Sequence, residues 1–397
     1  MKFFVFMLIF LYALPVVAQD SAAVKKQEAD ESVQQLAETM NKLMRKPTDA
    51  EQESMELLGQ WTMQLTEYLL NHEQPYAQAI GLNKTNAILQ SQATQIDPDT
   101  LQLLYQNHGQ HINKLVNNET LNIETLQILE NLCFLSELDD HCNRQALLDK
   151  QMQLYPSDLS VYIRPLQLAL ETDNQDLTAN LLKVMSGTQQ MTHVDYLLPE
   201  FIALIKDYVK TNPIPEKALI REKNDLIATT DFSEKDIPTM DEKMPDSQVY
   251  IMLISMQLAL PLPQFKPLKD SCQNNPDYSA ECLYIAKTMI NHGNTIITKA
   301  IGHVINIAVY ELNNQQDMLA ASQANHERFK QYAECLSKSY SQNNDFVADY
   351  FDENYSELWF TAEDELTRLT KIATYLYEKR LTEGADEAVN PETCIVQ

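Results

Sequence analysis

Two histidine residues are the first candidates for metal chemistry. His108 and His111 are three positions apart, so a helix would place both imidazole rings on one face. Imidazole pairs at this spacing can bind zinc or copper. No H-E-x-x-H order and no evident third ligand accompany them, and Gly109 between them is typical of a helix end. The sequence therefore favours a solvent-exposed helix end over a metal site.

A thiol nucleophile is the second candidate. Cys142 follows Asp139, Asp140 and His141, which are the kinds of group that activate a catalytic cysteine. In an exported protein, however, a cysteine is normally oxidised to a disulfide. Acidic residues at this position also suit the start of a following helix, where they complement the helix dipole. We therefore expect a structural role for this cluster.

The third candidate is the stretch of residues 345–365, where aromatic and acidic side chains are concentrated. Its carboxylates include Asp349 and Asp352, which could perform acid–base chemistry. The aromatic residues could line a ligand groove for a peptide or glycan, with the leading members Tyr350, Tyr355, Trp359 and Phe360. The alternative is a helix that packs its aromatic face inward, because Tyr355 and Trp359 are four residues apart. The spacing favours this alternative.

Glycine is scarce, and its scarcity limits the chemistry that the chain can perform. The 397 residues include 7 glycines, about a quarter of the number expected at an average usage of roughly 7%. Phosphate-binding loops and nucleophile elbows require glycine, and neither motif occurs in the sequence. Leu, Gln, Ala, Glu, Met and Lys, which favour helices, are abundant. The composition predicts an all-α protein, and we expect no cofactor.

Residues 1–18 have the features of a secretory signal peptide. Lys2 is followed by an apolar run over residues 3–14 and then by the small residues Val16-Val17-Ala18. The run is shorter than the ~20 residues of a membrane span, which favours cleavage over an uncleaved anchor. The most apolar later stretch, residues 249–262, is also too short to span a membrane. We expect an exported protein without a membrane span after signal removal, periplasmic in the favoured reading and secreted in the alternative.

Cysteine content supports export. Six cysteines in an exported chain predict disulfide bonds, although they allow fifteen pairings. Proximity in the sequence favours three pairs, which are Cys133 with Cys142, Cys272 with Cys282 and, by elimination, Cys335 with Cys394. A zinc site is the alternative, but its ligands would need a spacing near C-x₂₋₄-C, and these cysteines are further apart. We therefore expect no metal.

The charge of the chain restricts its partners. The formal net charge is −26, and removal of Lys2 with the signal makes the mature chain one unit more negative. A surface this acidic repels nucleic acids and anionic membranes. We expect no nucleic-acid partner and favour a protein or peptide.

Hydrophobic periodicity predicts two helical halves. Residues 19–230 are predicted to be a helical-repeat region, residues 231–247 a polar linker or long loop, and residues 248–397 a C-terminal helical domain held by disulfides. Thr48 and Glu51 form a capping-box pattern at one helix start. Further helices are predicted at residues 121–135, 193–212, 295–312 and 357–379. The helix at 295–312 is apolar on nearly every side, so we expect it in a core, with His303 as a hydrogen-bonded core residue.

Residues 156–187 resemble a tetratricopeptide repeat in length and pattern. The matching residues are Pro156 before the unit and Leu166, Ala169, Ala179 and Leu182 on its two helices. The unit departs from the family at its turn, where Asn174 replaces glycine, and no W-x₂-L-G-x₂-Y pattern recurs. The layout is also similar to that of exported bacterial proteins with a repeat-like first half and a cysteine-bearing helical second half. The resemblance implies an α-solenoid, a helical hairpin array whose concave surface binds a partner.

The leading hypothesis is an exported helical-repeat protein that binds or scaffolds a protein or peptide partner in a groove. A helical envelope enzyme that acts on a glycan or peptide through paired carboxylates is the first alternative. A purely structural assembly protein is the second. Binding leads because no motif in the sequence brings a nucleophile, a base and an orienting group together.

Overall fold

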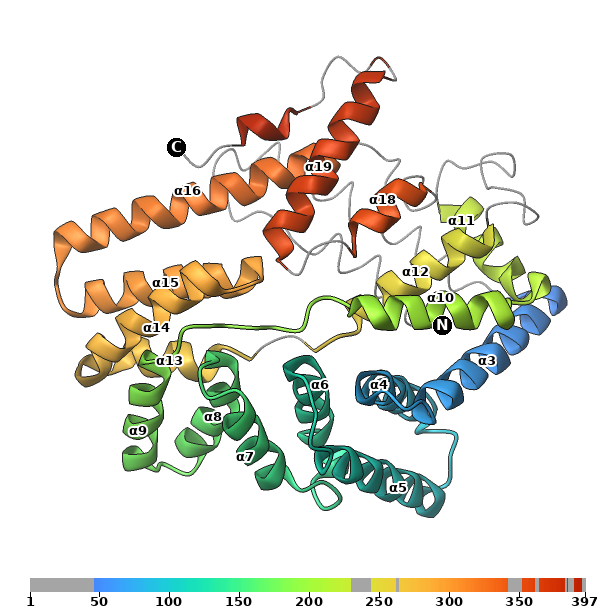
Figure 1. The fold of residues 1–397 in the computed structure, drawn as a ribbon, viewed down its shortest axis with the longest axis horizontal. Coiled ribbons are helices and arrows are strands. Elements are labelled where there is room, and N and C mark those ends of the chain that lie inside the picture. Colours follow the sequence, from blue (N-terminus) through green and yellow to red (C-terminus); the bar gives the residue numbers. More distant parts are fainter. Residues whose placement is uncertain are drawn as a thin grey trace. The chain divides into compact units, whose positions relative to one another are not determined.

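The computed structural model describes residues 46–229, 244–261, 264–341, 352–360, 364–382, 384 and 389–394. Regular secondary structure in these residues is helical, and two isolated β-bridges join single residues (Figure 1). The all-α prediction is confirmed. The predicted signal peptide and most of the predicted linker lie outside the described residues. Among the described helices, none has both the length and the apolar character of a bilayer span.

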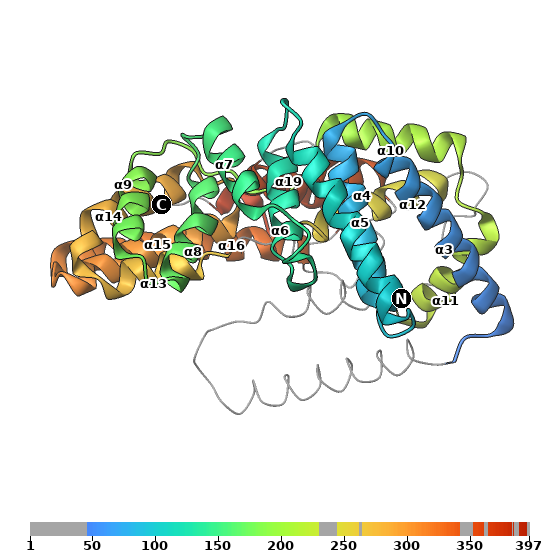
Figure 2. The same cartoon turned by 90° about the horizontal axis from the view of Figure 1, so that it is seen from below.

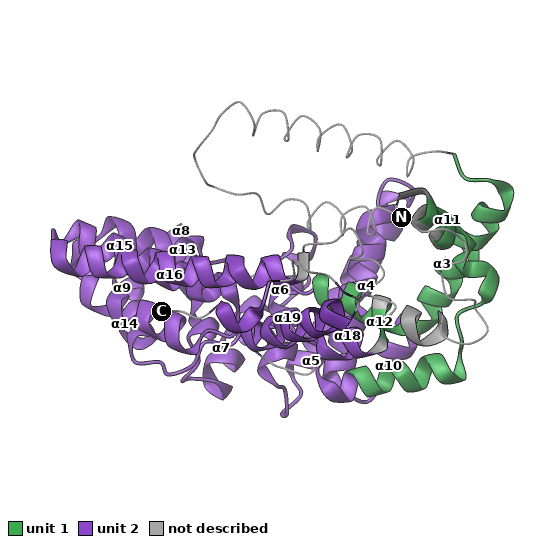
Figure 3. Cartoon of the chain, turned by 90° about the horizontal axis from the view of Figure 1, so that it is seen from above, with its two compact units in different colours: residues 1–65, 202–258, 347–353 green, residues 66–201, 259–346, 354–397 purple. Residues whose placement is uncertain are grey.

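The chain forms two compact units, each assembled from separate segments (Figure 3). Unit 1 comprises residues 1–65, 202–258 and 347–353, and unit 2 comprises residues 66–201, 259–346 and 354–397. This division differs from the sequential one predicted above, because both units contain residues from before and after the predicted linker. Segments that are distant in the sequence pack together, so a single cut along the chain does not separate the units.

Unit 1 includes most of α3 (Asp49–Leu70), which begins with the predicted capping box. The Thr48 N–H donates to Glu51 Oε2 (2.8 Å), and the Glu51 N–H donates to Thr48 Oγ1 (3.3 Å). The buried Glu51 carboxylate also lies 3.6 Å from Arg221 Nη1 and accepts a hydrogen bond from Asn224 (2.8 Å). Glu51 therefore starts α3 and also joins it to α11 (Ile220–Thr229).

Two further contacts join the helices of unit 1. Trp61 of α3 packs edge-on against Tyr208 of α10 (Pro199–Thr211), with ring centroids 5.9 Å apart. Lys206 of α10 donates to the hydroxyl of Tyr250 (2.9 Å) on α12 (Met244–Leu258). Helix α12 starts within the stretch predicted as linker, so the linker prediction is too long at its end.

A first series of helices belongs to unit 2. In chain order they are α4 (Pro75–Gln92), α5 (Pro98–Val116), α6 (Ile123–Cys133), η1 (Ser136–Leu138), α7 (Arg144–Leu154), η2 (Leu159–Tyr162), α8 (Ile163–Glu171) and α9 (Gln175–Ser186). Four of them have an N-cap residue whose side chain accepts a hydrogen bond from the backbone N–H three residues later. These N-cap residues are Asp97, Asn122, Asn143 and Asn174. Helices α8 and α9 pack against each other as a hairpin, and Asp173 in its turn has a φ of 50°. The stacking of such hairpins into a solenoid stays a prediction.

A second series of helices completes the described part of unit 2. They are α13 (Lys266–Asn274), η4 (Pro276–Tyr278), α14 (Ser279–His292), α15 (Ile296–Leu312), α16 (Gln316–Ser341), α18 (Glu353–Leu358), α19 (Glu365–Thr382) and η5 (Pro391–Thr393). The single helix predicted at residues 357–379 is wrong, because α18 ends and α19 starts within it. Asp364 caps the new start, since its Oδ1 accepts the Thr367 N–H (2.9 Å).

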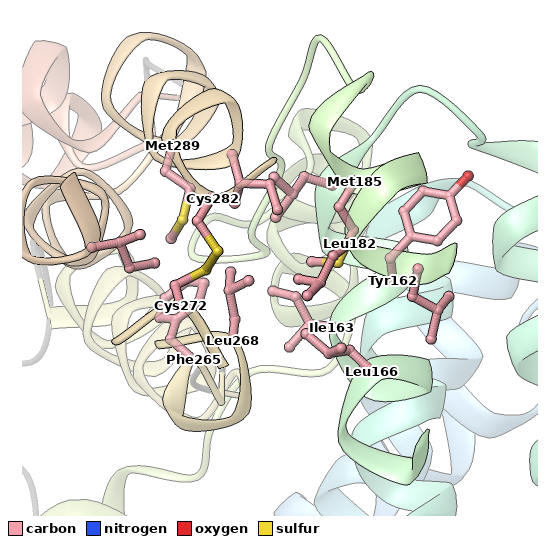
Figure 4. Packing of buried hydrophobic residues seen from close by; sticks show 14 of the residues in the cluster. Tyr162, Ile163, Leu166, Leu182, Met185, Phe265, Leu268, Cys272, Cys282 and Met289 are labelled. Carbon is pink, nitrogen blue, oxygen red and sulfur yellow. A yellow bond between two sulfur atoms is a disulfide. The ribbon is translucent and has the colours of Figure 1, made fainter. Parts of the chain in front are cut away.

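A hydrophobic core joins the hairpin α8–α9 to α13, α14 and α15 within unit 2 (Figure 4). Leu166 and Leu182 from the hairpin and Leu268 from α13 are fully buried in it. Helix α15 contributes Ile305 and Val309, both at 0% exposure, whereas Ile297 on the same helix is 44% exposed. Helix α15 therefore lies in the core, as predicted, with contacts to α13, α14 and α16, although Ile297 near its start is exposed. Figure 2 shows α13, α14 and α15 grouped beside α8 and α9.

Residues 187–198 form an extended segment between α9 and α10, visible as a long helix-free path in Figure 1. Isolated bridges pair its Gln190 with Asp158 and its Met191 with Gly293. The helix predicted from residue 193 is wrong over its first six positions, since α10 begins at Pro199. Proline disfavours helical geometry in the residue before it, which explains why the apolar pattern does not continue as a helix.

The six cysteines form the three predicted pairs. Cys133–Cys142 closes the loop between α6 and α7, and Cys272–Cys282 closes the loop between α13 and α14 within the core of Figure 4. Cys335–Cys394 joins α16 to the end of η5. The third bond lies in a small apolar cluster that includes Leu336 and Ala373.

Loop entropy predicts how much each disulfide contributes. Replacing Cys335 and Cys394 with serine is expected to lower the free energy of unfolding by about 4 kcal/mol, because the bond closes a loop with a sequence separation of 59. The same change at Cys133 and Cys142, with a separation of 9, is expected to cost about 3 kcal/mol. Urea unfolding measures both values. A reversed order would show that loop entropy does not set these contributions.

Candidate functional site

Two side-chain amides hold the backbone of the extended segment. Gln127 of α6 donates to the Thr192 carbonyl (2.8 Å) and accepts from the Val194 N–H (2.8 Å). On the other edge, Asn294 accepts from the His193 N–H (2.9 Å) and donates to the His193 carbonyl (2.7 Å). Each amide pairs with the backbone as a neighbouring β-strand would. We call this arrangement the amide clamp. It supplies hydrogen-bond partners for backbone N–H and carbonyl groups of a segment that is not part of a β-sheet.

A recess opens beside the amide clamp, within unit 2. Its volume, measured as the space open to the centre of a water molecule, is about 60 Å³, and the recess is open to solvent on one side. Its walls come from α6, the start of α8, the extended segment and the residues before α13. The polar side chains that matter below are Glu130, Asn131, Arg164, Gln167, His193 and Gln264. We call it the Arg164 recess.

Arg164 is fixed in place by its neighbours. Its Nε donates to Glu130 Oε1 (3.1 Å), its Nη1 donates to Gln167 Oε1 (2.7 Å), and its guanidinium carbon lies 4.5 Å from the centroid of the Phe134 ring. The second oxygen of Glu130 accepts from Gln151 (2.9 Å). Burial raises the pKa of Glu130, and the nearby Arg164 charge opposes that rise. The recess therefore contains one ion pair whose two side chains are 11% and 16% exposed.

Several donors in the Arg164 recess have no hydrogen-bond partner within the described chain. They are Nη2 of Arg164 and the side-chain amide nitrogens of Asn131 and Gln264. An arginine carries five N–H groups, so a guanidinium with one unoccupied nitrogen can still bind an acceptor. Burial lowers the pKa of His193 to about 4, so its ring in the recess wall is neutral near neutral pH. The recess thus offers donors to an oxygen-bearing ligand.

A second polar cluster lies where the extended segment meets α19. Arg368 Nη2 donates to Asp195 Oδ2 (2.8 Å), and Glu365 Oε2 accepts the Ile296 N–H (2.7 Å) at the start of α15. The Glu365 N–H donates to the Asn294 carbonyl (2.8 Å). Burial raises the pKa of Asp195 to about 6 even beside Arg368, and it raises the pKa of Glu365 as well. This cluster ties α19 and α15 to the amide clamp, which is a structural role.

The described part of the predicted aromatic groove packs inward. Tyr355 is 1% exposed, Trp359 packs edge-on against it with ring centroids 6.2 Å apart, and Phe360 is half-buried. Tyr350 lies outside the described residues, so the groove as a whole stays a prediction. The same holds for the carboxylate pair, of which Asp349 also lies outside them. The structure offers no open aromatic face here among the residues that it describes.

The predicted helix end at His108 and His111 is wrong. Helix α5 continues through Gly109, and His108 is 4% exposed. The glycine is needed because the disulfide loop packs against α5 here, and a Cβ at Gly109 would lie 2.5 Å from the His141 carbonyl oxygen. Burial lowers the pKa of His108 to about 4. Within the described residues, no group of three or more His, Cys, Asp or Glu side chains is arranged to hold a metal ion.

The cluster before Cys142 is structural, as expected. Cys142 is bonded to Cys133, and Asp139 pairs with Arg144 in the first turn of α7. The carbonyl of His141 accepts a hydrogen bond from Asn113 (2.9 Å) of α5. These bonds hold the loop against α5 and leave no free thiol there.

His303 is a core residue, but it packs differently from the prediction. It is 7% exposed, and its ring centroid lies 5.6 Å from that of His326 and 5.2 Å from that of Phe329. No described side chain or backbone group forms a hydrogen bond with its imidazole. Burial, with smaller effects from His326 and Lys299, lowers its pKa to about 4. The hydrogen-bonded environment expected from the sequence is therefore replaced by ring packing.

Comparison of the chain with protein-family models, with curated proteins and with solved structures gives no match. The tetratricopeptide resemblance thus stays a prediction, and the site must be interpreted from its own geometry.

Sequence reasoning missed the residues that build the clamp and the recess. Gln127 and Asn294 are unremarkable amides in a chain that contains many, and their partners are distant in the sequence. Arg164 gave a usable signal, because a cation inside the apolar run SVYIRPLQLAL is unusual in an acidic chain. Glu130 is a matching signal, because it is an acidic residue inside the apolar run TLQILENLCF. A charge within an apolar helical run, paired with an opposite charge on another, indicates a buried ion pair.

If the amide clamp stabilises the extended segment, removal of one of its amides should lower the free energy of unfolding substantially. Asn294→Ala would leave the partly buried N–H and carbonyl of His193 unpaired on that edge, and we expect the free energy of unfolding to fall by about 3 kcal/mol. Asn131→Ala is the matched control, because this half-buried amide has no partner in the described chain, and it should cost less than about 0.5 kcal/mol. Equal losses in urea unfolding would contradict the clamp.

The buried His303 predicts a loss of stability in acid. Its folded pKa of about 4 lies below the ordinary value of 6.5, so the unfolded chain binds the proton first. Neutral His303 therefore makes its full contribution to the free energy of unfolding above pH 6.5. That contribution, about 3 kcal/mol, is lost as the pH falls toward 4. The His303→Gln variant should lose correspondingly less stability over this interval, measured by urea unfolding at several pH values. His292→Gln, at an exposed position, should behave as the unmodified protein does.

Proposed function

We propose that this protein is an exported helical binding protein that takes an extended peptide segment of a partner into the Arg164 recess. The observation that carries the proposal is the set of donors in that recess, from Arg164, Asn131 and Gln264, that have no partner among the described residues. Peptide backbone supplies carbonyl oxygens at regular intervals, and such oxygens are what these donors require.

The amide clamp supports this proposal, because it is a contact between a side-chain amide and extended backbone within the chain itself. Gln127 forms part of the recess wall and, in the amide clamp, bonds to a carbonyl and an N–H of one extended strand. The bidentate pairing needs only backbone groups, so it is independent of peptide sequence. A partner segment in the neighbouring recess would meet amides of the same kind from Asn131 and Gln264.

The proposal includes the cellular compartment, which is outside the cytosol. Three disulfides, including the two that close short loops, are stable in an oxidising environment and rare in the cytosol. Together with the predicted signal peptide at residues 1–18, they support an exported protein. We favour the bacterial periplasm, with secretion as the alternative. A helical hairpin array, of which α8 and α9 form one unit, would present the recess to partners.

Filling the recess tests the function. Asn131→Trp places a large ring among the recess side chains without breaking a hydrogen bond of the described chain. We expect it to abolish binding of a pool of fluorescent random hexapeptides to the mature protein, measured by fluorescence polarisation. Gln153→Trp, on the exposed face of α7, is the matched control and should bind as the unmodified protein does. Absence of saturable binding by the unmodified protein would overturn the proposal.

A further inference from the structure

We propose that the Arg164 recess recognises a carboxylate of the bound peptide, and that the free nitrogen of Arg164 is the group that recognises it. This inference rests on the proposed function and adds the chemical group that the site selects. The carboxylate would accept from Nη2 of Arg164, with the amides of Asn131 and Gln264 available in the same recess.

The guanidinium of Arg164 is prepared for this contact before a ligand arrives. Glu130 and Gln167 each accept one of its hydrogen bonds, and the Phe134 ring lies 4.5 Å from its central carbon. A side chain held by three neighbours loses little conformational freedom when it binds a ligand. A hydrogen bond between charged groups is also about twice as strong as one between neutral groups. A carboxylate therefore gains more from this recess than a neutral carbonyl does.

The charges in the recess wall disfavour a ligand that carries more than one negative charge. The charged side chains in the recess wall are Arg164 and Glu130, and the His193 ring beside them is neutral near neutral pH. Glu130 already neutralises Arg164, and no other cation lies among the described residues of the wall, so the two negative charges of a phosphate would be repelled more strongly than the one charge of a carboxylate. A single carboxylate could accept from the guanidinium nitrogen that has no partner among the described residues, and Asn131 and Gln264 line the same recess.

Glu130 opposes the ligand that Arg164 attracts. Its carboxylate already bonds to the guanidinium at 3.1 Å, so an incoming carboxylate on the same guanidinium is repelled by it. Substitution of Glu130 by glutamine keeps an oxygen that can accept from Arg164 and removes the negative charge. The proposal therefore requires a gain of affinity from Glu130→Gln, which a misfolded protein would not show.

Two kinds of peptide carboxylate fit this chemistry, and the experiment separates them. Three pools of fluorescent hexapeptides are compared on the full mature chain by fluorescence polarisation. The first has a free C-terminus and no Asp or Glu, the second is amidated and has one central Glu, and the third is amidated without acidic residues. We expect one of the first two pools to bind about tenfold more tightly than the third, which identifies the source of the carboxylate.

Variants then assign the preference to Arg164. Glu130→Gln should tighten binding of the preferred pool severalfold and leave the third pool unchanged. In that background, Arg164→Gln should remove the preference without leaving a buried charge unpaired. Arg144→Gln in the same background is the matched control, because Arg144 also lies over the Phe134 ring, at 4.7 Å, but is not part of the recess wall.

The outcomes distinguish this inference from the proposed function. Equal binding of all three pools would overturn carboxylate recognition and leave peptide binding intact. Loss of the preference in the Arg144 variant, or no tightening in the Glu130 variant, would overturn the role of Arg164. Failure of every pool to bind would overturn the proposed function and this inference together.

Discussion

The amide clamp is the constraint on which the described structure of unit 2 depends. An extended segment in a helical protein has no sheet to pair its backbone, and unpaired backbone groups are costly to bury. Gln127 supplies the pairing on one edge and Asn294 supplies it on the other. Asn294 also receives the N–H of Glu365, whose carboxylate caps α15. Through these bonds one short stretch of backbone sets the positions of α6, α15 and α19, and it forms one wall of the Arg164 recess.

Local features of the sequence predicted much of this structure. Helical composition, the capping box at Thr48 and Glu51, and the two cysteine pairs that are close in the chain were all correct, because each depends on neighbouring residues or on composition as a whole. The hairpin of α8 and α9 was also predicted, from a polar turn between two apolar runs. The third disulfide followed only by elimination, since its sequence separation is 59.

Errors arose where contacts between distant segments outweigh local preference. Residues 193–198 continue an apolar pattern, yet their backbone pairs with amides and Pro199 delays the helix. Gly109 suggested a helix end, whereas it makes room for the His141 carbonyl of another loop. The recess could not be predicted because its amides have ordinary local surroundings and gain their meaning only from residues that folding brings to them. Hydrophobic periodicity predicts which face of a helix is buried, but it does not predict which polar groups form hydrogen bonds with each other.

Few cations are available in this chain, and the described structure places several of them against buried carboxylates. Lys and Arg total 30 against 56 Asp and Glu. Arg221 lies beside Glu51, Arg368 beside Asp195, and Arg164 beside Glu130. Desolvation opposes burial of either partner alone, so each guanidinium makes a neighbouring acid tolerable inside the protein. Arg164 differs from a purely structural partner because it lines a recess and its Nη2 has no partner among the described residues. How strongly it binds a ligand there depends on how much of its charge Glu130 already neutralises, so the pairing that stabilises the fold also sets the strength of the site.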